Sequence, residues 1–180
     1  LTARSIFIKI GIPMSEENIE VASENTNAPS FQIQRVYLKD ISLEQPNAPQ
    51  VFLVQGEPNV QIQIDIQFGQ LQDGVYEVIV LGNITTRVED KVLFLIEAQQ
   101  AGIFELKNIP AEQLEPMLAI ACPNVLYPYL RANIADLIGR GGFQPIHLAE
   151  INFHQLYEQR LNEVATASNA DQTSGIILPN

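Results

Sequence analysis

The sequence predicts an α+β fold, because strand-like segments come first along the chain and helix-like segments follow. Four segments between residues 31 and 104 are rich in β-branched and aromatic residues, and most of them alternate apolar with polar positions. From residue 109 onward, apolar residues recur instead at helical spacing. Short connections between the second, third and fourth strand segments predict an antiparallel meander.

Length and composition place the chain among single-domain proteins with a polar, acidic surface. It has 180 residues, of which 46% are hydrophobic and 17% charged, and its formal net charge is −11. An acidic surface disfavours nucleic acids and anionic membranes as partners and favours basic peptides. The single cysteine, Cys122, excludes a disulfide framework or a cysteine-based zinc site within one chain.

The first 30 residues are predicted to lie outside the folded domain. The opening LTARSIFIKIGIP resembles a signal peptide only in outline, because Lys9 interrupts the apolar run and no A-x-A site follows. We expect Met14 to be the true start, followed by a polar, acidic and disordered segment. No apolar run approaches the ~20 residues that span a bilayer.

The first strand segment is FQIQRVYLKDISLE, residues 31 to 44. Phe31 and Ile33 alternate with glutamines, the pattern changes near VYL, and it resumes with Ile41 and Leu43. This phase slip predicts a β-bulge. The next segment, QPNAPQVFLVQGEPN at 45 to 59, is rich in turn residues and is expected to be a long crossover loop.

The remaining strands form the meander. VQIQIDIQF, residues 60 to 68, places its apolar residues on one face and its polar residues on the other. The third strand runs from about Val75 to Arg87 after an Asp-Gly turn. The fourth, DKVLFLIEAQQAGIF at 90 to 104, contains five consecutive apolar residues. We interpret Phe94 and Ile96 as facing the helices and Leu95 as facing outward.

Three helices are expected after the strands. The first covers 109 to 121 and begins at Pro110. The second begins near Pro128, because the missing N–H of a proline costs nothing in the first turn of a helix, and it ends at Gly139. The loop GRGGFQPIHLAEI leads to a last helix at about 152 to 166, with Asn152 as its N-cap. Residues 167 to 180 have no periodicity and are expected to form a flexible tail.

Enzymatic chemistry finds weak support. His147, Glu150 and His154 could bind a metal if they shared a helix, but Pro145 and the nearby glycines favour a loop and surface histidines. Cys122 has no local signature of a nucleophile and is better explained as a buried residue. The GRGG segment follows a helix and lacks the residues of a phosphate-binding loop.

Two other features point to binding. Apolar residues occupy the loops, notably Phe52 in the crossover loop and Phe143, Ile146 and Leu148 after the second helix. They either cover the core or line an apolar groove. Asp40 and Glu44 share the parity of the outer face in the first strand, as Leu95 and Glu97 do in the fourth. They form either an ordinary solvated face or a surface for a basic, partly apolar peptide.

Several motifs together resemble the bacterial protein-export chaperone family SecB. They are FQIQRVYLKDISLEQPNAPQVF, YEV, EAQQAGIF, CPNVLYPYLR and GFQPIHLAEINF with the following LY, and the likeness covers residues 31 to about 160. The resemblance implies a SecB-like domain at 31–166: a four-stranded antiparallel sheet with two main helices on one face. It also implies a cytoplasmic homotetramer, a dimer of dimers, with no catalysis, no cofactor and no metal of its own.

The resemblance also implies partners and their sites. Such a chaperone binds unfolded precursor proteins without ATP, keeps them translocation-competent and delivers them to the ATPase SecA. The SecA contact would use Asp40, Glu44, Leu95 and Glu97. The client groove would be lined by Phe52, Phe94, Tyr127, Tyr129, Phe143, Ile146 and Leu148.

Two departures from the family pattern stand out. Gln55-Gly56-Glu57 replaces an aromatic residue found before Pro58 in some relatives, and the C-terminal tail is less acidic than in the family. The alternative function is that of an oligomeric structural or assembly protein whose apolar loops serve only its own subunits.

Overall fold

A single four-stranded sheet with helices on one side makes up the fold. The computed structural model describes residues 28–173, so the expected N-terminal segment up to residue 27, including Met14, and the tail from 174 lie outside the described residues. The elements, in chain order, are β1 (Ser30–Glu44), η1 (Gln50–Leu53), β2 (Asn59–Gln72), β3 (Val75–Val88), β4 (Lys91–Lys107), α1 (Ala111–Pro116), η2 (Met117–Ala121), α2 (Cys122–Arg140) and α3 (Phe153–Thr173). The predicted α+β class is confirmed. No helix within residues 28–173 has the length and apolarity needed to cross a membrane.

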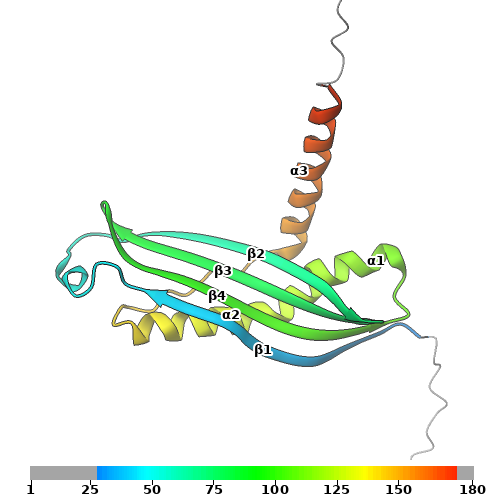
Figure 1. The fold of residues 1–180 in the computed structure, drawn as a ribbon, viewed down its shortest axis with the longest axis horizontal. Helices are drawn as coiled ribbons and strands as arrows, with labels where there is room; N and C mark the ends of the chain where they lie inside the picture. Colours follow the sequence, from blue (N-terminus) through cyan, green and yellow to red (C-terminus); the bar gives the residue numbers. More distant parts are fainter. Residues whose placement is uncertain (1–27, 174–180) are drawn as a thin grey trace, which may run out of the picture.

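The sheet is antiparallel throughout, with strand order β1-β4-β3-β2. Figure 1 shows α2 running along one side of this sheet, which we call the core face; the other side is the outer face. Phe94 and Ile96 lie on the core face and are buried, whereas Leu95 between them lies on the outer face and is partly exposed. The prediction for these three residues is therefore confirmed.

Strand β1 carries two register shifts against β4, between Ile33 and Arg35 and between Leu38 and Asp40. The bulge expected near VYL is therefore confirmed and is accompanied by a second one. Each bulge inserts one extra residue and changes which side chains face outward. The second bulge places Tyr37 on the outer face together with the later residues Asp40 and Glu44.

The chain is helical without a break from α1 through the π-helical segment η2 to the end of α2. The expected start of the second helix at Pro128 is wrong, since α2 begins at Cys122 and Pro128 lies inside it. A proline in a helix interior removes a hydrogen bond and costs about 3 kcal/mol. Tertiary packing outweighs this cost, because a row of buried side chains at four-residue spacing covers the sheet. These residues are Cys122, Leu126, Leu130, Ile134 and Ile138.

Close approach of α2 to the sheet depends on Gly102 in β4. A Cβ atom at this position would lie 2.8 Å from Cδ2 of Leu126 and 2.8 Å from Cε2 of Phe104, inside van der Waals contact. Leu126 and Phe104 are both fully buried. The absence of a side chain at Gly102 therefore sets the distance between helix and sheet.

Helix α3 leaves the body of the protein instead of lying flat on the sheet (Figure 1). The backbone N–H of Gln155 donates to Oδ1 of Asn152 at 3.1 Å, which confirms the predicted N-cap. The helix continues to Thr173, past the expected end at 166. Its first turns contact η2, and Arg160 donates hydrogen bonds to the Asp65 carboxylate and to the Ile66 carbonyl of β2.

Candidate functional site

An acidic patch lies on the outer face of β1 and β4. We use this name for Asp40, Glu44, Leu95 and Glu97. In the β1–β4 register, Glu44 is opposite Leu95, Ser42 is opposite Glu97, and Asp40 is opposite Gln99. The structure thus brings all four residues onto one face of two adjacent strands. Within the described residues, none of the three carboxylates takes part in an ion pair.

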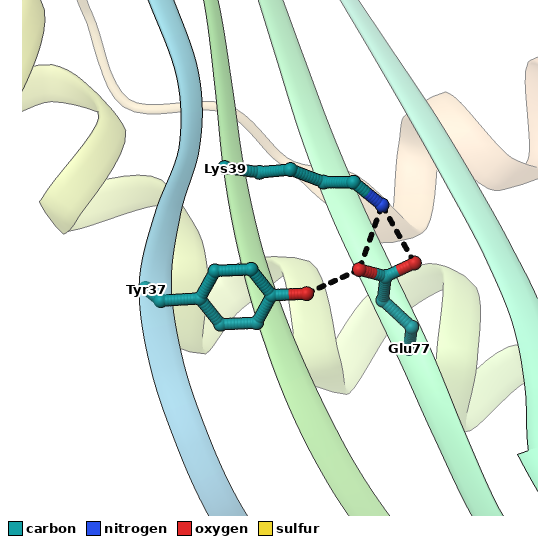
Figure 2. A network of polar contacts seen from close by, with 3 residues as sticks. All are labelled: Tyr37, Lys39 and Glu77. Carbon is teal, nitrogen blue, oxygen red and sulfur yellow. Dashed lines mark hydrogen bonds and ion pairs between the residues drawn. The ribbon is translucent and has the colours of Figure 1, made fainter.

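A polar network lies next to the acidic patch on the same face (Figure 2). The Tyr37 hydroxyl donates to Oε1 of Glu77, and Nζ of Lys39 lies 2.8 Å and 2.9 Å from the two carboxylate oxygens of Glu77. The hydrogen bond to Glu77, with smaller contributions from burial and from the charge of the carboxylate, raises the pKa of Tyr37 to about 12. The Lys39 hydrogen bond, followed by that of Tyr37, lowers the pKa of Glu77.

This network also controls the charge beside the acidic patch. Lys39 immediately precedes Asp40 in the sequence. Because its ammonium group is bound to Glu77 on β3, its charge is compensated by that carboxylate. Asp40 can therefore present its negative charge to a partner.

An apolar cavity of about 190 Å³ opens where two loops meet the core face of the sheet. The ring of Phe143, from the loop after α2, stacks on Phe52 of the crossover region at 5.2 Å between centroids, and it lies 4.8 Å from Phe94 of β4. We call this cavity the apolar groove. Its lining residues are Pro58, Val60, Thr86, Leu93, Phe94, Phe143, Gln144, Pro145 and Ile146.

The structure separates the expected groove residues into two sets. Phe94, Phe143 and Ile146 line the apolar groove, and Phe52 joins them through its contact with Phe143. Leu148 is 2% exposed and belongs to the core instead.

The two tyrosines of α2 also lie outside the apolar groove. Tyr127 is 3% exposed, because its hydroxyl donates to the Ala149 carbonyl at 2.6 Å and its ring packs edge-on against Phe153. Tyr129 is 52% exposed and is not among the residues that line the cavity.

Sequence reasoning missed an exposed apolar row on β2. Ile62, Phe68 and Leu71 are all substantially exposed, although the alternation of β2 assigned an inward position to the first two. The reason is that β2 is the edge strand, and α2 packs over β3 and β4. A second cavity, of about 250 Å³, adjoins this row; its lining residues are Ile66, Phe68, Glu115, Ala119, Leu156, Tyr157, Arg160 and Leu161.

The residues considered for catalysis are placed apart from one another. His147 lies in an exposed loop and His154 on α3, and within the described residues no three potential ligands among His, Cys, Asp and Glu form a group. Cys122 is fully buried, and this burial raises the pKa of its thiol to about 12. A thiol with such a pKa is a poor nucleophile at neutral pH.

Comparison with known proteins gives consistent matches. The family model described as preprotein translocase subunit SecB matches residues 24–164. The protein-export protein SecB of Ralstonia pickettii is 59% identical over 151 residues, covering 84% of this chain and 88% of that protein. The corresponding protein of Cupriavidus metallidurans is 57% identical over 161 residues, covering 88% of this chain and 92% of that protein.

One solved structure resembles the fold. It is a SecB-like chaperone of Mycobacterium tuberculosis, in complex with a peptide from an antitoxin. The TM-score is 0.57 with 17% sequence identity, and the match covers 67% of this chain and 90% of that one. At this identity, the likeness concerns the fold alone.

Proposed function

The chain belongs to the SecB family and is a chaperone for preprotein export, and we propose that it holds unfolded precursors at its apolar groove and delivers them to the ATPase SecA. The observation that carries this proposal is apolar surface left open on a folded domain. The apolar groove and two exposed residues of β2, Ile62 and Phe68, lie on the core-face side of the sheet. Unfolded chains expose apolar segments, which such a surface can bind without selecting a single sequence.

The client-binding residues of this proposal are taken from those expected from the sequence, and their places in the structure decide the role of each. Phe52, Phe94, Phe143 and Ile146 form the contact area, and Tyr129 is available at the surface of α2. Tyr127 and Leu148 are buried and do not line the cavity, so we leave them out of the contact area. Binding to the unfolded state of a client slows its folding by mass action.

Delivery to SecA is assigned to the acidic patch. Glu44 and Glu97 lie beside Leu95 on the outer face, and Asp40 lies further along the same face, opposite Gln99. This arrangement suits a basic partner segment that carries some apolar surface. The acidic patch and the apolar groove lie on opposite faces of the sheet. A precursor and SecA can therefore be bound at the same time.

Assembly and location complete the proposal. The chain works in the cytoplasm as a homotetramer, a dimer of dimers, so that a client contacts several subunits at once and gains avidity from weak individual sites. It acts without catalysis, cofactor or ATP, and the handover to SecA releases the client.

Suppression of aggregation tests this function. We expect the chain to prevent the aggregation of a denatured precursor at stoichiometric amounts without nucleotide, and native mass spectrometry to show a tetramer carrying the client. A protein that assembles but leaves the precursor to aggregate would instead be a structural or assembly protein. Client release by nucleotide alone would also contradict the proposal.

A further inference from the structure

Thr86 of β3 carries a buried hydroxyl group at the apolar groove. Its side chain is 1% exposed, and within the described residues its Oγ1 atom has no hydrogen-bond partner. In the sheet register, Thr86 lies between Val60 of β2 and Phe94 of β4. All three residues line the groove. Buried side-chain hydroxyls in folded proteins are nearly always hydrogen-bonded, so this one requires an explanation.

The surroundings of Thr86 account for the missing partner. The other groove residues are apolar apart from Gln144, which is an exposed residue of the loop after α2. Valine has nearly the same shape as threonine and would fill the same space without a polar atom to desolvate. In the client-free protein the hydroxyl therefore lowers stability, and an apolar site of purely structural purpose would be better served by valine.

We propose that the Thr86 hydroxyl forms a hydrogen bond with the main chain of a bound client at the residue whose apolar side chain occupies the groove. This inference rests on the proposed function and specifies what the groove recognises: an extended polypeptide carrying a large apolar side chain. A main-chain contact is available in every polypeptide. It therefore adds affinity while leaving sequence selectivity low.

Access to Thr86 requires the loop after α2 to move. Phe143 and Ile146 reach the groove from this loop, which follows Gly141 and Gly142. Gly142 has φ +86°, a conformation that glycine adopts readily. Phe143 is held by contacts with two aromatic rings and not by a hydrogen bond from its side chain. As the loop moves, the Phe143 ring can exchange its contacts with Phe52 and Phe94 for contacts with the side chain of the client, so that it remains part of the client-binding surface.

Two variants of the full-length chain test the proposal, Thr86→Val and Thr86→Ser. The probe is a synthetic peptide with one phenylalanine in a background of glycine, serine and lysine, together with a series in which single amides near the phenylalanine are replaced by esters. An ester lacks the N–H and is a weaker acceptor at the carbonyl. We expect Thr86→Val to weaken binding of the all-amide peptide by about two- to tenfold, and Thr86→Ser to retain the affinity.

The ester series identifies the contact. One ester position should weaken binding to the wild-type chain and have no effect on Thr86→Val. The thermal midpoint of Thr86→Val without peptide should equal or exceed that of the wild type, because an unsatisfied buried group is removed. Weaker binding together with equal or higher stability separates a binding role from a structural one.

Several results would overturn the inference. One is that Thr86→Val binds the all-amide peptide as strongly as the wild type does. Another is that no ester position lowers the affinity of the wild-type chain, a measurement that does not depend on how the variant folds. If a second copy of this chain occupies the groove, it competes with the peptide. The measured affinity for the peptide would then decline as the protein concentration rises. If the wild type binds neither peptide nor denatured proteins, the proposed function itself is wrong.

Discussion

Tyr37 on β1 donates a hydrogen bond to Glu77 on β3, across the intervening strand β4. Figure 2 shows the phenol ring reaching over β4 and Lys39 approaching the same carboxylate. The residue opposite Tyr37 on β4 is Ala101, which is fully buried. Its small side chain leaves room for the ring, and the network ties three strands together beside the acidic patch.

Replacing Tyr37 by phenylalanine should change the alkaline stability of the protein. The pKa of Tyr37 is raised to about 12 in the folded chain, from an ordinary value of 10.0. The folded state therefore holds this proton more tightly, so the contribution to stability is complete below about pH 10 and is lost as the pH rises towards about 12. Urea unfolding at a series of pH values should show a smaller alkaline loss in Tyr37→Phe than in the wild type.

At neutral pH, the same variant should lose about 1 kcal/mol of unfolding free energy, the usual contribution of one hydrogen bond. Tyr127 and Tyr157 also have raised pKa values, but both are present in the wild type and in Tyr37→Phe. Their contributions to the alkaline loss of stability therefore cancel when the two proteins are compared. Identical alkaline profiles would show that the hydrogen bond to Glu77 does not persist in solution.

Glu77→Gln should weaken SecA binding although Glu77 is not part of the acidic patch. Without the carboxylate, the Lys39 ammonium group is free to compensate the charge of Asp40, its neighbour in sequence. We expect a reduction of about two- to fivefold in affinity for SecA, the scale of one exposed ion pair. Isothermal titration calorimetry at low and at physiological salt concentration measures this change in affinity.

The double variant Lys39→Met/Glu77→Gln is the matched control, because it removes both charges of the pair. It should recover most of the wild-type affinity. Persistent weak binding in the double variant would assign the effect to distortion of the sheet instead of charge.

Glu97→Lys should weaken SecA binding directly. The substitution places a positive charge opposite Ser42, between Asp40 and Glu44 on the neighbouring strand. We expect at least a roughly fivefold loss at physiological salt, shrinking as salt is added, because exposed charges are screened over ~8 Å under these conditions. Client binding should remain nearly unchanged.

Glu112→Lys on α1 provides the control for net charge, since Glu112 is exposed and lies away from the outer face. It should leave SecA affinity close to that of the wild type. Equal loss of client and SecA binding in Glu97→Lys would identify Glu97 as a structural residue.

Phe143→Ser should impair client capture more than SecA binding. The substitution removes one aromatic ring from the lining of the apolar groove, and an aromatic pair between this ring and a client side chain would contribute about 0.5–1.5 kcal/mol beyond its buried area. Fluorescence binding of a denatured precursor should weaken by about tenfold. Tyr129→Ser, at an exposed aromatic residue outside the cavity, should have a smaller effect; the reverse order would relocate the client site to the surface of α2.

Local patterns in the sequence predicted much of the sheet and the acidic patch. Alternation with a period of two residues is a property of the strand itself, so the outward parity of Leu95 and Glu97 could be inferred without knowledge of the fold. The N-cap at Asn152 was predictable for the same reason, because its hydrogen bond closes within one helical turn.

Features that depend on packing between distant segments could not be inferred in this way. Pro128 marks a helix start by local rules, yet the buried row that begins at Cys122 keeps the helix continuous through it. The exposure of Ile62 and Phe68 follows from the edge position of β2, which local patterns do not specify. Tyr127 is turned inward by a hydrogen bond to Ala149, a residue 22 positions later.

The two glycines at positions 102 and 69 have opposite consequences for anyone who wishes to diversify this protein. Gly102 has atoms of Leu126 and Phe104 where a methyl group would go, whereas nothing lies within 4 Å of that place at Gly69. A combinatorial library randomised at both codons and selected for folding should therefore return glycine at 102 and a broad range of residues at 69. Labels and cross-linkers belong at 69, where they leave the contact between helix and sheet intact.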